Sequence, residues 1–158
     1  MNAKLFPHFR PQKNNTYCGL ASTAIVLSAL NDKTIEEEDI IKIASISSLN
    51  QENISNSGVS LSYLEDILNS IDEFKTEGVK GIHADQIHSA EILRHNLVRY
   101  LDRGSFIFMN YLLDFDLGGI GEGHHSPLTA YNQTADMFLI LDVWKFSEPF
   151  WIKTDLLY

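Results

Sequence analysis

The chain has 158 residues, of which 44% are hydrophobic and 21% are charged, as in an ordinary soluble globular domain. Its 12 basic and 21 acidic residues give a net charge of −9, which argues against nucleic acid and anionic membranes as partners because both attract basic surfaces. No stretch approaches the ~18 apolar residues of a membrane span, and the first residues lack the apolar centre of a secretory signal, so we expect one cytoplasmic domain.

The N-terminal part of the chain is predicted to lead into a buried helix. Residues 1–16 are expected to be extended, because Pro7 and Pro11 disfavour helix. The run CGLASTAIVLSAL is apolar almost all round, which predicts a core helix from Cys18 to about Leu30.

A second helix is predicted to end near Ser45. Thr34 and Glu37 form the T-x-x-E pattern of a capping box at its start. The acidic run at 36–39 then lies in the first turns, where it complements the positive end of the helix dipole. We expect these four side chains to be exposed to solvent rather than to bind a metal.

A polar loop and two further helices follow. Residues 47–59 are rich in Asn and Ser and are predicted to form a loop. Ser60 can cap a helix with the sequence LSYLEDILNSI, and Ser89 can cap another, AEILRHNLVRYLDR, which Gly104 is expected to end.

The last third of the chain is rich in β-forming residues. Short stretches at 105–113, 126–133 and 137–144 are predicted to be strands, with the sequence TAD as a turn between the last two. Helices followed by strands predict an α+β fold with a mostly antiparallel sheet.

The single cysteine, Cys18, is a candidate nucleophile. It stands directly before Gly19 at the start of the predicted core helix, where the positive end of the helix dipole favours a thiolate. One cysteine cannot form an internal disulfide or a Cys-rich zinc site. The alternative is a buried thiol that acts only as a small hydrophobic residue.

A nucleophilic thiolate also needs a base, and the stretch GEGHHSP supplies two adjacent histidines, His124 and His125. Their side chains should point to opposite faces of a strand. Asp142, flanked by apolar residues in LILDV, needs a polar partner and can orient one imidazole. Strand parity leaves the choice open, since an even-length turn pairs Asp142 with His125 and an odd one with His124.

Gln12 is a candidate oxyanion donor. Its amide, six residues before Cys18, can join the Cys18 backbone N–H in stabilising a tetrahedral oxyanion. The chain order Gln, Cys, His, Asp is that of papain-like thiol catalysis.

The motifs Q-x5-CGLAS, GH-x-SP-L-x2-Y and D-M-x-LILDV-x-K-F-x2-P-x-W, with GVSL before the third helix, resemble the catalytic domain of the phytochelatin synthase family. This family is a branch of the papain-like cysteine peptidases, and the resemblance implies one such domain over residues 1–158. The family's Cys-His-Asp triad maps to Cys18, His124 and Asp142, and its oxyanion glutamine maps to Gln12. The resemblance therefore selects His124, and leaves His125 where the family often has an aromatic residue.

The resemblance implies acyl transfer from glutathione or a related small thiol peptide. The Cys18 thiolate attacks the Cys–Gly amide, glycine leaves, and a γ-glutamylcysteinyl thioester forms. Water then gives hydrolysis, whereas the amine of a second glutathione gives a longer peptide. The resemblance implies no cofactor for cleavage, and a divalent metal takes part as a thiolate complex of the substrate.

Two departures from the family pattern bear on the substrate. Many members have Arg three residues after the catalytic Asp, where this chain has Lys145, which keeps the charge without the bidentate fork and is a weaker candidate for substrate binding. The sequence given also ends at Tyr158, before later family residues that help to hold glutathione. On these grounds we expect hydrolysis to exceed polymerisation.

Other functions fit parts of the pattern. A papain-like peptidase that cleaves bacteriocin leaders also uses Q-x5-C with a later His and Asp. An acyltransferase that takes its acyl group from a carrier thioester is a further enzymatic alternative. A catalytically inactive binding module is the alternative from another class.

Overall fold

The computed structural model describes residues 2–46, 51–75, 78–113 and 122–158. The helical elements are η1 (Ala3–His8), α1 (Cys18–Asn31), α2 (Glu37–Ile43), α3 (Gln51–Ser57), α4 (Leu61–Ser70), α5 (Asp72–Lys75), η2 (Ala84–Gln86), α6 (Ala90–Asp102) and α7 (Thr154–Leu157). The strands are β1 (Ile107–Leu113), β2 (Glu122–Asn132), β3 (Met137–Ile140) and β4 (Phe150–Lys153).

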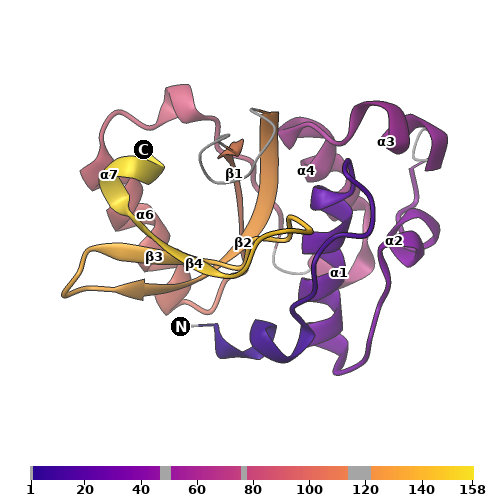
Figure 1. Cartoon of the computed structure of the whole chain (residues 1–158), viewed down its shortest axis with the longest axis horizontal. Helices are drawn as coiled ribbons and strands as arrows, with labels where there is room; N and C mark the ends of the chain where they lie inside the picture. The colour runs from indigo at the N-terminus through magenta and orange to yellow at the C-terminus, as the bar shows by residue number, and fades with distance from the viewer. Residues whose placement is uncertain (1, 47–50, 76–77, 114–121) are drawn as a thin grey trace.

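The four strands form one antiparallel sheet in the order β1-β2-β3-β4. Helices α1 to α4 gather on one side of the molecule, and the sheet lies beside them with α6 and α7 (Figure 1). The predicted α+β architecture, with helices first and an antiparallel sheet after them, is confirmed.

Helix α1 is the central helix, as its apolar sequence predicts. Every residue from Cys18 to Ser28 is buried, so the helix has no solvent-facing side over these turns. Two of its buried hydroxyls are satisfied within the helix, since those of Thr23 and Ser28 donate to the carbonyls of Gly19 and Ala24.

The predicted caps of the later helices are confirmed. The Ser60 hydroxyl accepts the backbone N–H of Tyr63 at the start of α4, and the Ser89 hydroxyl accepts that of Ile92 at the start of α6. Gly104 follows α6 with a φ of +78°, a conformation that glycine adopts without steric cost.

Some local predictions are wrong. The lead-in contains the 3-10 helix η1 with Pro7 inside it, and the predicted loop at 47–59 contains α3, although 47–50 lie outside the described residues. The capping box of α2 pairs Glu36 with Asp39 instead of Thr34 with Glu37. Strand β2 begins at Glu122, earlier than predicted, and β4 was not predicted.

The acidic run at the start of α2 is only partly solvated. Glu37 is 1% exposed, and its carboxylate accepts the backbone N–H of Lys13 at 2.9 Å. Burial raises the pKa of Glu37 to about 7, although the N–H of Lys13 favours the carboxylate. Glu37 therefore holds the N-terminal segment, through the backbone of Lys13, against α2.

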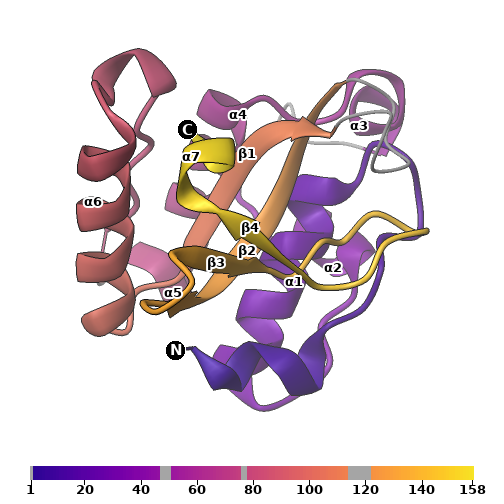
Figure 2. The same ribbon diagram turned by 60° about the vertical axis from the view of Figure 1, so that its left-hand side comes forward.

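Two apolar cores flank the sheet. The larger joins α1, α2 and α4 to the chain after β3, and the smaller joins α6 to β2 and β3. Figure 2 shows α6 beside one face of the sheet and α1 beside the other. Within the described ranges, none of the helices is both long and apolar enough to cross a membrane.

Candidate active site

Cys18 is the first residue of α1, and its side chain is 7% exposed. The chain turns into the helix over residues 14–17, where the N–H of Tyr17 donates to the carbonyl of Asn14. The first N–H groups of an α-helix have no acceptor within the helix, so they provide partial positive charge beside the thiol.

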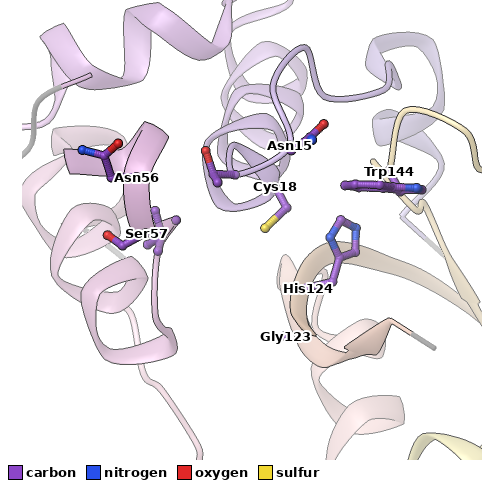
Figure 3. Close-up of a pocket in the computed structure, with 10 residues that line it drawn as sticks. Asn15, Cys18, Asn56, Ser57, Gly123, His124 and Trp144 are labelled. Atoms are coloured by element: carbon purple, nitrogen blue, oxygen red, sulfur yellow. The ribbon is translucent and has the colours of Figure 1, made fainter. Parts of the chain in front are cut away.

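A cavity of about 250 Å³ opens at this helix start. Cys18 and His124 face one another in it, while Asn56 and Ser57 of α3 lie on the opposite side (Figure 3). The lining residues are Asn15, Thr16, Cys18, Asn56, Ser57, Gly58, Val59, Gly123, His124 and Trp144.

His124 lies between the thiol and a carboxylate. Its Nε2 is 2.8 Å from Oδ1 of Asp142, which leaves Nδ1 for the side of the ring that faces Cys18. The same Oδ1 accepts the backbone N–H of Trp144 at 2.9 Å and the Ser126 hydroxyl at 3.4 Å. Asp142 is therefore held by several donors, and it fixes the orientation of the imidazole.

The charges of this pair follow from burial and hydrogen bonding. Burial disfavours the charged imidazole, but hydrogen bonds to Asp142 and Cys18 outweigh it and raise the pKa of His124 to about 9. Burial likewise raises the pKa of Asp142, but hydrogen bonds from His124 and from the N–H of Trp144 outweigh it, and the net shift is downward. At neutral pH the site therefore holds an imidazolium beside a carboxylate.

Two aromatic residues enclose the imidazole. The Trp144 ring is perpendicular to that of His124 at 6.2 Å and is 4% exposed, and the Tyr111 ring approaches it edge-on at 5.6 Å. The Tyr111 hydroxyl donates to Ser126, and burial together with the Asp142 charge raises the pKa of Tyr111, so the phenol stays neutral. These rings keep water from the His124–Asp142 hydrogen bond.

Gln12 lies near the site but is bonded elsewhere. Its backbone N–H donates to the carbonyl of Val143 at 2.6 Å, beside Asp142. Its side-chain Nε2 donates to the carbonyls of Asn14 and Asn15, at 2.7 and 2.9 Å. The Oε1 atom is buried with no hydrogen-bond partner among the described residues.

Lys145 lines a second cavity of about 330 Å³ together with Lys13, Asn14, Asn15 and Thr16. Asn15 and Thr16 also line the first cavity, so the two are adjacent. The ammonium group of Lys145 lies 5.0 Å from the ring centre of Phe146 and 5.9 Å from that of Trp144.

The structure thus brings together Cys18, His124 and Asp142, and directs His125 away from them. The cavity residues of α3 were not anticipated, because a polar Asn/Ser-rich stretch is typical of a loop. Trp144, at the end of the stretch 137–144, is buried and also lines the cavity.

A cysteine at the start of a buried helix, facing a histidine and an aspartate carried by an antiparallel sheet, defines a papain-like α+β protein. The chain belongs to the phytochelatin synthase family, whose model, described as "Phytochelatin synthase", matches residues 2–158. The resemblance noted in the sequence is therefore confirmed.

Two relatives from Arabidopsis thaliana are similar to this chain. Glutathione gamma-glutamylcysteinyltransferase 1 is 27% identical over 175 residues, and glutathione gamma-glutamylcysteinyltransferase 2 is 26% identical over 174 residues. Both alignments cover 98% of this chain but only 32% and 34% of the relatives, so the chain spans about a third of their length.

Proposed function

We propose that this chain is a cysteine acyltransferase or hydrolase that acts on glutathione or a related γ-glutamyl thiol peptide through a thioester on Cys18. The observation that carries the proposal is the position of His124, which faces Cys18 and is 2.8 Å from the buried Asp142. Family membership and the names of the two relatives support glutathione as the substrate.

Acylation begins with attack of the Cys18 thiolate on the carbonyl carbon of the Cys–Gly amide. A C–S bond forms, and the carbonyl oxygen becomes an oxyanion. The His124 imidazolium then gives a proton to the amide nitrogen, the C–N bond breaks, and glycine leaves. Asp142 stabilises the imidazolium until the proton is transferred.

Deacylation uses the same histidine as a base. Neutral His124 takes a proton from water or from the amine of an acceptor peptide, which attacks the thioester carbonyl. The thiolate of Cys18 leaves as the C–S bond breaks. Water yields γ-glutamylcysteine, and the amine of a second glutathione yields a longer peptide.

The oxyanion needs donors near Cys18. Its own backbone N–H, at the first position of α1, is the nearer candidate. Gln12 is the second candidate. It can donate to the oxyanion when its Nε2 gives up its hydrogen bond to the carbonyl of Asn14 or to that of Asn15. The unpartnered Oε1 favours such a change, because a buried polar atom without a partner costs about 1–3 kcal/mol.

The proposal also includes a role for the charged residue Lys145, a role for a divalent metal ion, and a location in the cell. Lys145, in the adjacent cavity, is positioned to bind a substrate carboxylate. Cleavage needs no resident metal because the helix start and His124 activate the thiol, and a divalent ion would enter as a thiolate complex of the substrate. A free cysteine and a thiol substrate suit a reducing compartment, so the proposal includes the cytoplasm.

The test is incubation with glutathione, with and without zinc or cadmium, followed by mass spectrometry of the protein and the small molecules. We expect a γ-glutamylcysteinyl adduct on Cys18 and free glycine, both absent from Cys18→Ala. The ratio of γ-glutamylcysteine to longer peptides separates hydrolysis from transfer. A folded protein that forms no adduct, but whose Cys18 reacts readily with iodoacetamide, would point to another peptide or a carrier-bound acyl donor.

A further inference from the structure

His125 is a buried histidine that the proposed mechanism does not use. It follows His124 on β2, is 1% exposed, and pairs across the sheet with Asn110, whereas His124 pairs with Tyr111. Alternation along the strand therefore directs the two imidazoles to opposite faces. A buried imidazole in a protein is expected to have a hydrogen-bonding role.

The His125 ring bonds to the backbone of a distant segment. Its Nε2 is 2.8 Å from the carbonyl oxygen of Val59, so Nε2 carries the hydrogen and donates it. The Asn110 amide nitrogen lies 3.3 Å from Nδ1, which can accept in this tautomer, and 3.0 Å from Nε2. Burial lowers the pKa of His125, so the ring is neutral at neutral pH.

The Val59 carbonyl belongs to the wall of the active-site cavity. Gly58 and Val59 connect α3 to the cap of α4, and both line the cavity that Cys18 and His124 also line. The Val59 side chain also packs on the helix start, since a Cβ placed on Gly19 would lie 3.4 Å from the Cβ of Val59. This two-residue segment therefore borders both the nucleophile and the space beside it.

His125 is itself anchored to α1. The Ser22 hydroxyl, one turn after Cys18, donates to the His125 carbonyl at 3.1 Å. The residue thus links three parts of the site: β2, the nucleophile helix, and the wall formed by Gly58 and Val59.

We propose that His125 is a positioning residue that holds the Gly58–Val59 wall in place and so sets which acyl groups the cavity admits. The inference rests on the proposed function in naming a peptidyl acyl group as the occupant. Without the donor, the Val59 carbonyl is left buried and unpaired, and the wall moves to find another partner. The reactivity of Cys18, which depends on His124 and the helix start, does not change.

Three variants separate the donor from the bulk of the ring. His125→Phe keeps a ring without a donor, His125→Gln places an amide N–H near the position of Nε2, and His125→Asn carries its amide one carbon closer to the backbone and cannot reach Val59. Because Cys18 is the single cysteine, its alkylation rates report on this cavity alone. The probes are iodoacetamide and 5-iodoacetamidofluorescein, which share a reactive group and differ in size.

In the wild type, iodoacetamide should react much faster than the bulky reagent. We expect His125→Phe to change the ratio of the two rates by about tenfold, as for a lost buried hydrogen bond, while the iodoacetamide rate stays constant. His125→Gln should keep the wild-type ratio. If His125→Phe does not fold, as judged by its melting transition, His125→Asn replaces it. The ratio of the two alkylation rates in His125→Asn should then differ from that of wild type as expected for His125→Phe.

An unchanged ratio in the variants without the donor would overturn the proposal. So would a parallel loss of the iodoacetamide rate, since His125 would then act on the nucleophile instead of the wall. With glutathione, the expected change is a raised KM at constant kcat. The alkylation ratio does not require turnover, so it tests His125 even if wild-type protein releases no glycine, the result that would defeat the proposed function instead.

Discussion

Replacing Asp142 with Asn should lower the pKa of His124 and narrow the pH range in which the imidazolium stabilises the fold. An Asn side chain keeps an oxygen that can accept from Nε2 of His124 and from the N–H of Trp144. The substitution therefore removes the negative charge and leaves the geometry largely intact.

The magnitude follows from the pKa of His124. Its rise from 6.5 to about 9 corresponds to about 3 kcal/mol, at 1.36 kcal/mol per pKa unit. A neighbouring opposite charge typically accounts for about 1–3 pKa units, so in Asp142→Asn the pKa of His124 should fall from about 9 to about 6–8.

The sign of the stability effect is set by the direction of this shift. Because the pKa of His124 is higher in the folded state, its contribution to stability is full below pH 6.5 and is lost as the pH rises towards 9. Asp142→Asn should therefore be less stable than wild type by about 1–4 kcal/mol at pH 6, and this deficit should shrink by pH 10.

The assay is urea denaturation of wild type and Asp142→Asn at pH 6, 8 and 10, with histidine ring NMR to follow the pKa of His124. Asp85→Asn, which neutralises an exposed carboxylate that does not line the active-site cavity, is the matched control. The alkaline limb of kcat/KM for glycine release should shift to lower pH together with the NMR titration. A deficit that is the same at all three pH values would refute the proposed pairing of charges.

Three further predictions concern groups outside the triad. Because the pKa of Glu37 is raised to about 7, the folded state should lose stability as the pH rises from 4.5 to 7. In urea denaturation, the free energy of unfolding of Glu37→Gln relative to wild type should therefore increase by roughly 3 kcal/mol between pH 5 and pH 8. If this relative stability is the same at both pH values, the assignment of the raised pKa to Glu37 is contradicted. Asp136 accepts two hydrogen bonds from Arg94, which hold the pKa of Asp136 well below its usual range. Asp136→Asn, which tolerates the left-handed backbone there, should melt lower at pH 7, with a gap that narrows below pH 4; equal gaps would contradict the role of the ion pair. Lys145→Met should raise the KM for glutathione by about five- to tenfold at constant kcat, and Lys145→Arg should restore it; an unaffected KM would remove Lys145 from the substrate site.

Local signals explain which elements could be predicted from the sequence. The continuous apolar run after Cys18 requires a buried helix. Ser60 and Ser89 each cap a helix through a hydroxyl that accepts the N–H three residues further on. Glu37 shows the opposite case. An acidic run at a helix start looks solvated, and only the arrival of the N–H of Lys13, distant in the sequence, buries one of its members.

The choice between His124 and His125 depends on a feature that residue patterns do not reveal. Asn132 pairs with Met137, so the turn between β2 and β3 has four residues, an even number that by itself would place Asp142 on the face of His125. The register then shifts between Leu128 and Ala130, where β2 contains one extra residue. A shift of one residue exchanges the two faces of a strand, and it brings Asp142 to His124.

The same shift has a consequence for His125. Once His124 faces Asp142, the next side chain must face the other way, towards the Gly58–Val59 wall, where a hydrogen-bond donor meets the Val59 carbonyl. One bulge therefore places both histidines, one beside Asp142 and one against the Gly58–Val59 wall. Deletion of Thr129, which lies between the two registers, should exchange the faces to which His124 and His125 point and abolish glycine release. The substitution Thr129→Val keeps the number of residues in β2, so this variant should still release glycine. Activity in the deletion variant would show that the bulge does not set the pairing of His124 with Asp142.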